Sequence, residues 1–115
     1  MWYTISSEDK PLSLKKRLAA RPSHLARLEE LKNHGRLLVA GPHPAIDNEN
    51  AGDYGFTGSL IIAEFDSLNS ANIWAADDPY VKEGVYSKED YKKYRDFRRS
   101  VAKQENLRIA ISKKQ

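Results

Sequence analysis

Three polar residues interrupt a leucine-rich segment near the N-terminus at steps of four and three. Arg17, Arg21 and His24 fall on one side of a predicted helix, and a helical wheel places that side toward the core. A histidine there can transfer protons near neutral pH, and an arginine can hold an anionic oxygen. The alternative is a structural role, in which the side chains snorkel or pair within the protein, because a buried unpaired charge is costly.

Two adjacent carboxylates, Asp77 and Asp78, precede Pro79 at the predicted exit of a later helix. Consecutive side chains diverge, so one of the two can point inward while the other faces solvent. A carboxylate beside His24 would fix the tautomer of the imidazole and make it a usable base. Sequence spacing alone does not establish that contact.

The elements that must position these residues follow from hydrophobic periodicity and from breaks at glycine and proline. Ser13 is the predicted N-cap of a helix that ends near His34, before Gly35, and Pro22 is expected to kink or split it. The leucines at positions 14, 18, 25, 28 and 31 are its expected buried face. Strands are predicted over residues 2–6, 36–40 and 59–65, with a long loop over residues 41–58.

A second helix is predicted after residue 65, capped by Asp66 or Ser67 and ending before Pro79. Residues 87–104 have the pattern of a basic helix, and residues 107–111 alternate as a final strand. This order fits an α+β ferredoxin-like split βαβ sandwich, a four-stranded antiparallel sheet with its helices on one face and one inserted helix. The 115 residues suffice for a single domain.

Composition excludes several classes of protein. There is no cysteine, so disulfides, thiolate nucleophiles and cysteine-ligated metals are absent, and the spacing of the three histidines predicts no metal site. No apolar run is long enough to span a membrane, and no signal peptide is evident, which predicts a cytoplasmic protein without membrane contact. No cofactor motif is found.

Charge is divided unevenly along the chain. Residues 1–85 carry nine Lys/Arg and twelve Asp/Glu, a net charge of −3, whereas residues 86–115 carry ten and four, a net charge of +6. Nucleic-acid binding would therefore depend on the basic segment 88–103. The aromatic residues of that segment form one stripe, which favours packing against the body of the protein over base stacking.

Several stretches of residues 1–86 resemble the YciI-like (YCII-related) family. They are KRLAARPSHL at 16–25, LVAGP at 38–42, GFTGS at 55–59, DPYV at 78–81 and GVY at 84–86. The resemblance implies a ferredoxin-like fold that pairs into a homodimeric α/β barrel, with a small-molecule cleft in each protomer. The characteristic histidine and aspartate of the family fall on His24 and Asp78, an acid–base pair by likeness to isomerases and to a dehydrochlorinase.

The predicted function is therefore cofactor-independent proton shuttling or elimination on a small enol, lactone or phenol. His24 and Asp78 would be catalytic. The expected substrate-binding residues are Arg17, Arg21, Gly41, Pro42, Ser59 and Tyr80, and the loop between Gly41 and Ser59 would cover the site. Two alternatives stay open: a ligand-binding or protein-interaction module without catalysis, and nucleic-acid binding through the C-terminal segment. The sequence names no substrate.

Residues 87–115 depart from the family pattern. Members run from the Gly-Val-Tyr stretch directly into a final strand, whereas this chain has the basic helix pattern of residues 87–104 first. We interpret residues 1–115 as one domain with a helix inserted before a late final strand.

Overall fold

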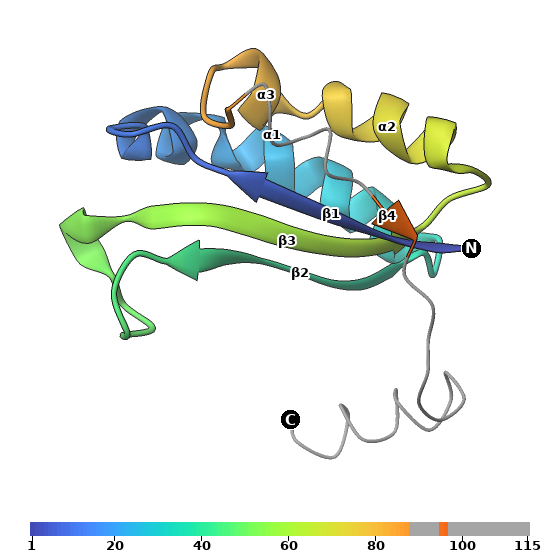
Figure 1. The fold of residues 1–115 in the computed structure, drawn as a ribbon, viewed down its shortest axis with the longest axis horizontal. Helices are drawn as coiled ribbons and strands as arrows, with labels where there is room; N and C mark the ends of the chain where they lie inside the picture. Colours follow the sequence, from blue (N-terminus) through green and yellow to red (C-terminus); the bar gives the residue numbers. More distant parts are fainter. Residues whose placement is uncertain (88–94, 97–115) are drawn as a thin grey trace.

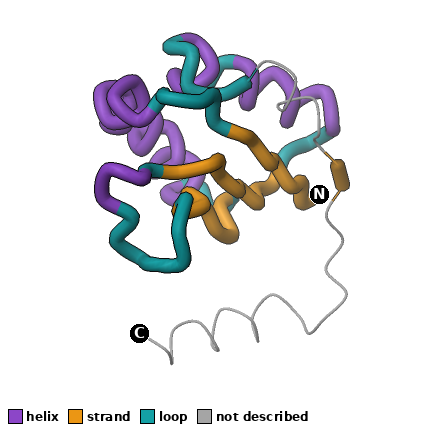
Figure 2. Tube along the Cα trace, turned by 60° about the vertical axis from the view of Figure 1, so that its left-hand side comes forward, coloured by secondary structure: helices purple, strands orange, loops and turns teal. Residues whose placement is uncertain are grey.

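The computed structural model describes residues 1–87 and 95–96, and shows an antiparallel sheet with helices packed on one face (Figure 1). The elements are β1 (Trp2–Glu8), α1 (Leu14–Asn33), β2 (Leu37–Pro44), the 3-10 helix η1 (Gly52–Tyr54), β3 (Phe56–Glu64), α2 (Leu68–Ala76), α3 (Pro79–Lys82) and β4 (Arg95–Asp96). This architecture confirms the predicted α+β class, and the strand order β2-β3-β1-β4 is consistent with a ferredoxin-like fold. The predicted four-stranded sheet is met only in part, because three strands are long and β4 has two residues. Figure 2 shows the strands and helices in separate layers.

The core lies between the sheet and the helices because β1 and β3 alternate in register. Tyr3 is opposite Ala63 and Ile5 is opposite Ile61, and all four side chains are buried toward the helices. A second buried cluster, around Tyr80, joins α3 to α1. This second cluster surrounds the predicted site.

Helix α1 follows its predicted bounds, and its buried face matches the prediction only in part. Leu18 and Leu25 are exposed, whereas Arg17 and His24 are buried, because these two polar side chains find partners inside the protein. Pro22 does not split the helix, because one helix runs from Leu14 to Asn33 with Pro22 inside it. Pro22 lies on the exposed side, where water can solvate the carbonyl that loses its hydrogen bond.

Strand β2 is longer than predicted. It continues through Gly41, Pro42, His43 and Pro44, which were expected to open the loop. A strand at the sheet edge has one side without ladder hydrogen bonds, so proline is tolerated there, and β2 is such an edge strand. The connection to β3 is correspondingly shorter and contains η1.

The segment from Asp77 to Tyr80 is more than a helix exit. Asp78 is the N-cap of the short helix α3, whose first residue is Pro79. Ser67 caps α2 as predicted, its hydroxyl accepting a hydrogen bond from the backbone N–H of Ser70 at 3.1 Å.

The basic helix predicted over residues 87–104 is wrong at residues 95–96, which form strand β4. This two-residue strand pairs with β1 beside Tyr3 and Thr4, whereas the other three strands have seven to nine residues. The final strand predicted at 107–111 lies outside the described residues, as does the rest of the basic segment.

Candidate functional site

His24 and Asp78 meet in the interior, although 54 positions separate them in the sequence. Nδ1 of His24 lies 2.9 Å from Oδ1 and 3.0 Å from Oδ2 of Asp78. A carboxylate accepts hydrogen bonds, so Nδ1 is assigned as the protonated nitrogen, which leaves Nε2 as the ring nitrogen available to a ligand. The Tyr80 backbone N–H donates to Oδ1 of Asp78 at 2.9 Å. Asp78 is thus held by the start of α3 and in turn orients His24.

The ring of Tyr80 lies at the centre of the site. It stacks on the His24 imidazole, with centroids 3.9 Å apart and planes 7° from parallel. Tyr86 packs edge-on against Tyr80 at 5.4 Å, and the Arg17 guanidinium lies 4.8 Å from the centroid of the Tyr80 ring. Tyr80 therefore links the histidine to the arginine and restricts the rotation of the imidazole.

Arg17 is held by a carboxylate that sequence reasoning missed. Nε and Nη2 of Arg17 donate to the two carboxylate oxygens of Asp9 at 2.8 and 2.9 Å, and both side chains are buried. Nη2 also donates to the Gly58 carbonyl at 3.1 Å and to Ser59 Oγ at 2.7 Å. Burial disfavours the charged guanidinium, but the hydrogen bonds and the negative charge of Asp9 favour it more strongly, so the pKa of Arg17 is raised. The signal for Asp9 in the sequence was indirect: a buried arginine requires a carboxylate, and Asp9 follows the first strand.

A cleft of about 450 Å³ opens in front of His24, and we call it the His24 cleft. The structure places all six predicted substrate-binding residues on its wall: Arg17, Arg21, Gly41, Pro42, Ser59 and Tyr80. Arg21 is exposed, whereas Arg17 is buried; Asp78 does not line the cleft and contacts His24 from behind. The remaining wall is apolar and comes mainly from residues not predicted as ligand contacts: Leu18, Leu25, Leu28, Ala40, Phe56 and Ile61.

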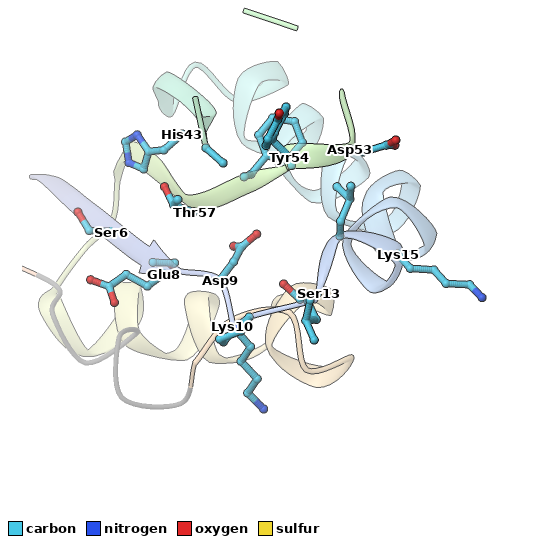
Figure 3. Close-up of a pocket in the computed structure, with 17 residues that line it drawn as sticks. Ser6, Glu8, Asp9, Lys10, Ser13, Lys15, His43, Asp53, Tyr54 and Thr57 are labelled. Carbon is cyan, nitrogen blue, oxygen red and sulfur yellow. The ribbon is translucent and has the colours of Figure 1, made fainter. Parts of the chain in front are cut away.

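A larger cavity, of about 840 Å³, lies beyond the Arg17–Asp9 pair (Figure 3). Asp9 lines this large cavity, Arg17 lines the His24 cleft, and Phe56 contributes to both. Tyr54, near the end of the β2–β3 connection, also lines the large cavity. The segment predicted to cover the site therefore borders the His24 cleft through residues at its two ends, and it also borders the large cavity through His43, Ala45 and residues 53–57.

Within the described part of the chain, no group of three or more His, Cys, Asp or Glu side chains is arranged to hold a metal ion. In the same residues, no helix has both the length and the hydropathy needed to cross a membrane.

No hydrogen bond of regular geometry reaches the buried hydroxyl of Tyr86 among the described residues, and burial raises the pKa of this phenol by more than the nearby Ser59 hydroxyl lowers it. Tyr86→Phe removes the orphaned hydroxyl, so we expect unchanged stability or a gain of about 1 kcal/mol at pH 7. A phenol whose pKa is higher in the folded than in the unfolded protein contributes fully to folding stability below about pH 10, the ordinary tyrosine pKa. The protein loses that contribution as the pH rises from there toward the folded-state pKa. The advantage of Tyr86→Phe should therefore grow above pH 10, measured by urea unfolding at pH 7 and 10.5.

The exposed Tyr54 supplies the control, because Tyr54→Phe should match wild type at pH 7. A loss of more than about 1 kcal/mol in Tyr86→Phe at pH 7 would mean that the hydroxyl makes a stabilising hydrogen bond.

The fold and the buried His–Asp pair define a small α+β protein in which a carboxylate-bonded histidine lines a cleft. The YCII-related domain matches residues 1–95, and the chain belongs to this family. It is 58% identical over 86 residues to Protein YciI of Escherichia coli, covering 75% of this chain and 88% of that protein. It is 56% identical over 87 residues to an uncharacterized protein of Haemophilus influenzae, covering 76% and 89%.

Among solved structures, the chain is similar to 5-chloro-2-hydroxyhydroquinone dehydrochlorinase of Burkholderia phenoliruptrix in complex with 2,5-dihydroxybenzoquinone. The TM-score is 0.74 at 28% sequence identity, with 87% of this chain and 96% of that chain covered. The family prediction from the sequence is thereby confirmed.

Proposed function

We propose that this protein is a cofactor-independent enzyme that moves protons on a small enol, lactone or phenol. The observation that carries the proposal is the His24–Asp78 pair, because a histidine bonded to a carboxylate through Nδ1 presents a basic Nε2. Nε2 takes a proton from the substrate, and the released electron pair forms a double bond. In an isomerisation His24 returns the proton to another atom; in an elimination a leaving group departs with its own electron pair.

The His24 cleft suits such a substrate in size and polarity. Its volume of about 450 Å³ lies within the range of small-molecule sites, and most of its wall is apolar. Arg17 or Arg21 would stabilise the oxyanion that develops as the proton leaves. The similarity to a dehydrochlorinase with a bound quinone supports a flat oxygenated ring as the ligand class.

We include a cytoplasmic homodimer in the proposal. Residues of β1 and β3 alternate across the sheet, so one set of side chains faces away from the helices. On that side Val39 of β2 is 49% exposed, and its neighbour Ile62 of β3 is buried. A sheet face without covering helices is suited to packing against a second sheet.

The test is a screen of enolisable phenols, lactones and chlorinated hydroquinones in D₂O, following proton exchange and chloride release by NMR and ion chromatography. We expect wild type to turn over at least one compound, and His24→Asn to lower kcat by about 10²–10⁴-fold. Binding of 2,5-dihydroxybenzoquinone should change only a few-fold in the variant. Asp78→Asn should lower kcat too, with the ¹⁵N shifts of His24 reporting a changed tautomer.

His34 provides the matched control, because it is an exposed histidine on the same helix. His34→Asn should keep wild-type turnover. Full turnover in His24→Asn would overturn the proposal, and ligand binding without turnover in wild type would favour the non-catalytic alternative.

A further inference from the structure

A third hollow, which we call the Arg27–Arg36 groove, is lined by residues of α1, of α2 and of the ends of the sheet. It has a volume of about 630 Å³ and shares no lining residue with the His24 cleft. Its walls come from α1, from the segments that precede β2 and follow β3, and from α2. Arg27, Arg36, Phe65, Ser70, Ile73 and Trp74 are its principal lining residues.

The two arginines of the groove are fixed in place without a direct ion pair in the described residues, although Lys82 and, to a smaller extent, Arg27 lower the pKa of the Asp77 carboxyl. Arg27 Nη2 donates to the Trp74 carbonyl at 2.6 Å, and Arg36 Nε donates to the Glu64 carbonyl at 3.0 Å. Within residues 1–87, neither guanidinium forms an ion pair with a carboxylate. The groove also contains Asp77, but this carboxylate is paired with Lys82 at 2.7 Å.

Aromatic stacking holds both guanidinium groups further. The Arg27 guanidinium lies 4.2 Å from the Trp74 ring centroid, and that of Arg36 lies 5.2 Å from Phe65. The two rings contact each other with centroids 5.6 Å apart and planes tilted by 50°, so the four side chains form one contiguous cluster. Nη1 of Arg27 is buried without a hydrogen-bond partner in the described part of the chain. Each arginine is therefore already oriented, and a ligand would pay little of the usual ordering cost.

The apolar part of the groove is accessible. Ile73 is 63% exposed and lies beside Trp74 in α2. A flat hydrocarbon ring can contact Ile73 while an attached oxyanion faces the guanidinium groups. A forked guanidinium matches a carboxylate or a phosphate equally well.

We propose that the Arg27–Arg36 groove binds an aromatic oxyanion, in which a carboxylate or phosphate group is carried on a flat ring. This site is separate from the proposed catalytic cleft and does not depend on any turnover there. The positive charge selects the anion, and the aromatic stack with Ile73 selects the ring.

The experiment titrates the ¹⁵N-labelled full chain with benzoate and with phenyl phosphate, following the indole N–H signal of Trp74. Trp2→Phe assigns the two indole signals. We expect a saturable shift with a Kd of about millimolar for at least one ligand, and none with sodium chloride at equal ionic strength. Inorganic phosphate, which lacks the ring, should bind more weakly, and the comparison of benzoate with phenyl phosphate identifies the preferred oxyanion.

Arg36→Gln removes one guanidinium and should weaken binding at least tenfold. Lys32→Gln removes an exposed charge of α1 that lies outside the groove, and its Kd should stay within about twofold of that of wild type. Ile73→Glu places a carboxylate at an exposed position and should abolish binding, whereas Ile73→Gln should not. A shift that does not saturate, that chloride reproduces, or that persists unchanged in both Arg36→Gln and Ile73→Glu overturns the proposal.

Discussion

Asp9→Ala is expected to destabilise the protein by about 3–5 kcal/mol, because it leaves the Arg17 charge buried without its counter-ion. Arg17 would keep its bonds to Gly58 and Ser59, but neither acceptor carries a negative charge. Only 5% of the Arg17 side chain is exposed, so water replaces the carboxylate poorly. Urea unfolding followed by circular dichroism measures the loss directly.

A double-mutant cycle separates the pair from its surroundings. Combining Asp9→Ala with Arg17→Met removes the uncompensated charge, so the double variant should be more stable than Asp9→Ala alone. The control is Asp77→Ala, which breaks an exposed ion pair with Lys82 and should leave the unfolding transition unchanged. If Asp9→Ala lost less than about 1 kcal/mol, the His24 cleft would be solvating Arg17 and the pair would not be holding it.

The Arg17–Asp9 pair also explains which part of the α1 prediction held. The helical wheel correctly places Arg17 and His24 on the buried side, but Leu18 and Leu25, which the leucine spacing favours as core residues, are exposed on the wall of the His24 cleft. Arg17 and His24 stay inside because their carboxylates come from elsewhere in the chain. A helical wheel contains only local information, so it cannot identify a partner supplied by another element.

The main elements of the body were predictable for local reasons. Alternating β-branched and aromatic residues marked β1, and the apolar run after Gly58 marked β3. β1 continues to Glu8, beyond its predicted end, whereas β3 starts earlier, at Phe56, and ends at Glu64, one residue before its predicted end. Gly35, with a φ of 70°, stops α1 where a left-handed residue was expected. The extent of β2 was not predictable, because proline is accepted there only as a consequence of the edge position in the finished sheet.

The candidate site was predictable in its members but not in its contacts. His24 and Asp78 were matched by resemblance to a family, and the residues alone left their contact open. The contact depends on Asp78 serving as the N-cap of α3, which aims the carboxylate inward while Asp77 faces solvent. No family resemblance pointed to Asp9, and a single carboxylate after a strand looks like an ordinary turn residue.

Gly58→Ala is expected to have the largest effect of any small substitution in the sheet. A β-carbon at position 58 would overlap the backbone carbonyl oxygen of Ser7, where β3 lies against β1. Backbone cannot move aside as a flexible side chain can, so the two strands must separate locally. The Gly58 carbonyl also accepts a hydrogen bond from Arg17, so the change would disturb the site as well. We expect a loss of more than about 4 kcal/mol in the free energy of unfolding.

Gly41→Ala is the matched control, because a β-carbon there meets no atom within 4 Å and the backbone conformation is not left-handed. Gly41 lies opposite Leu60 in the β2–β3 pairing, on the rim of the His24 cleft, so its substitution should change stability by less than about 1 kcal/mol. Thermal unfolding of both variants beside wild type compares them directly. A melting temperature of Gly58→Ala within a few degrees of that of Gly41→Ala would contradict the prediction. It would mean that β1 and β3 can separate at Ser7 without loss of stability, and that the close contact of Gly58 with Ser7 is not needed to hold Arg17 beside the cleft.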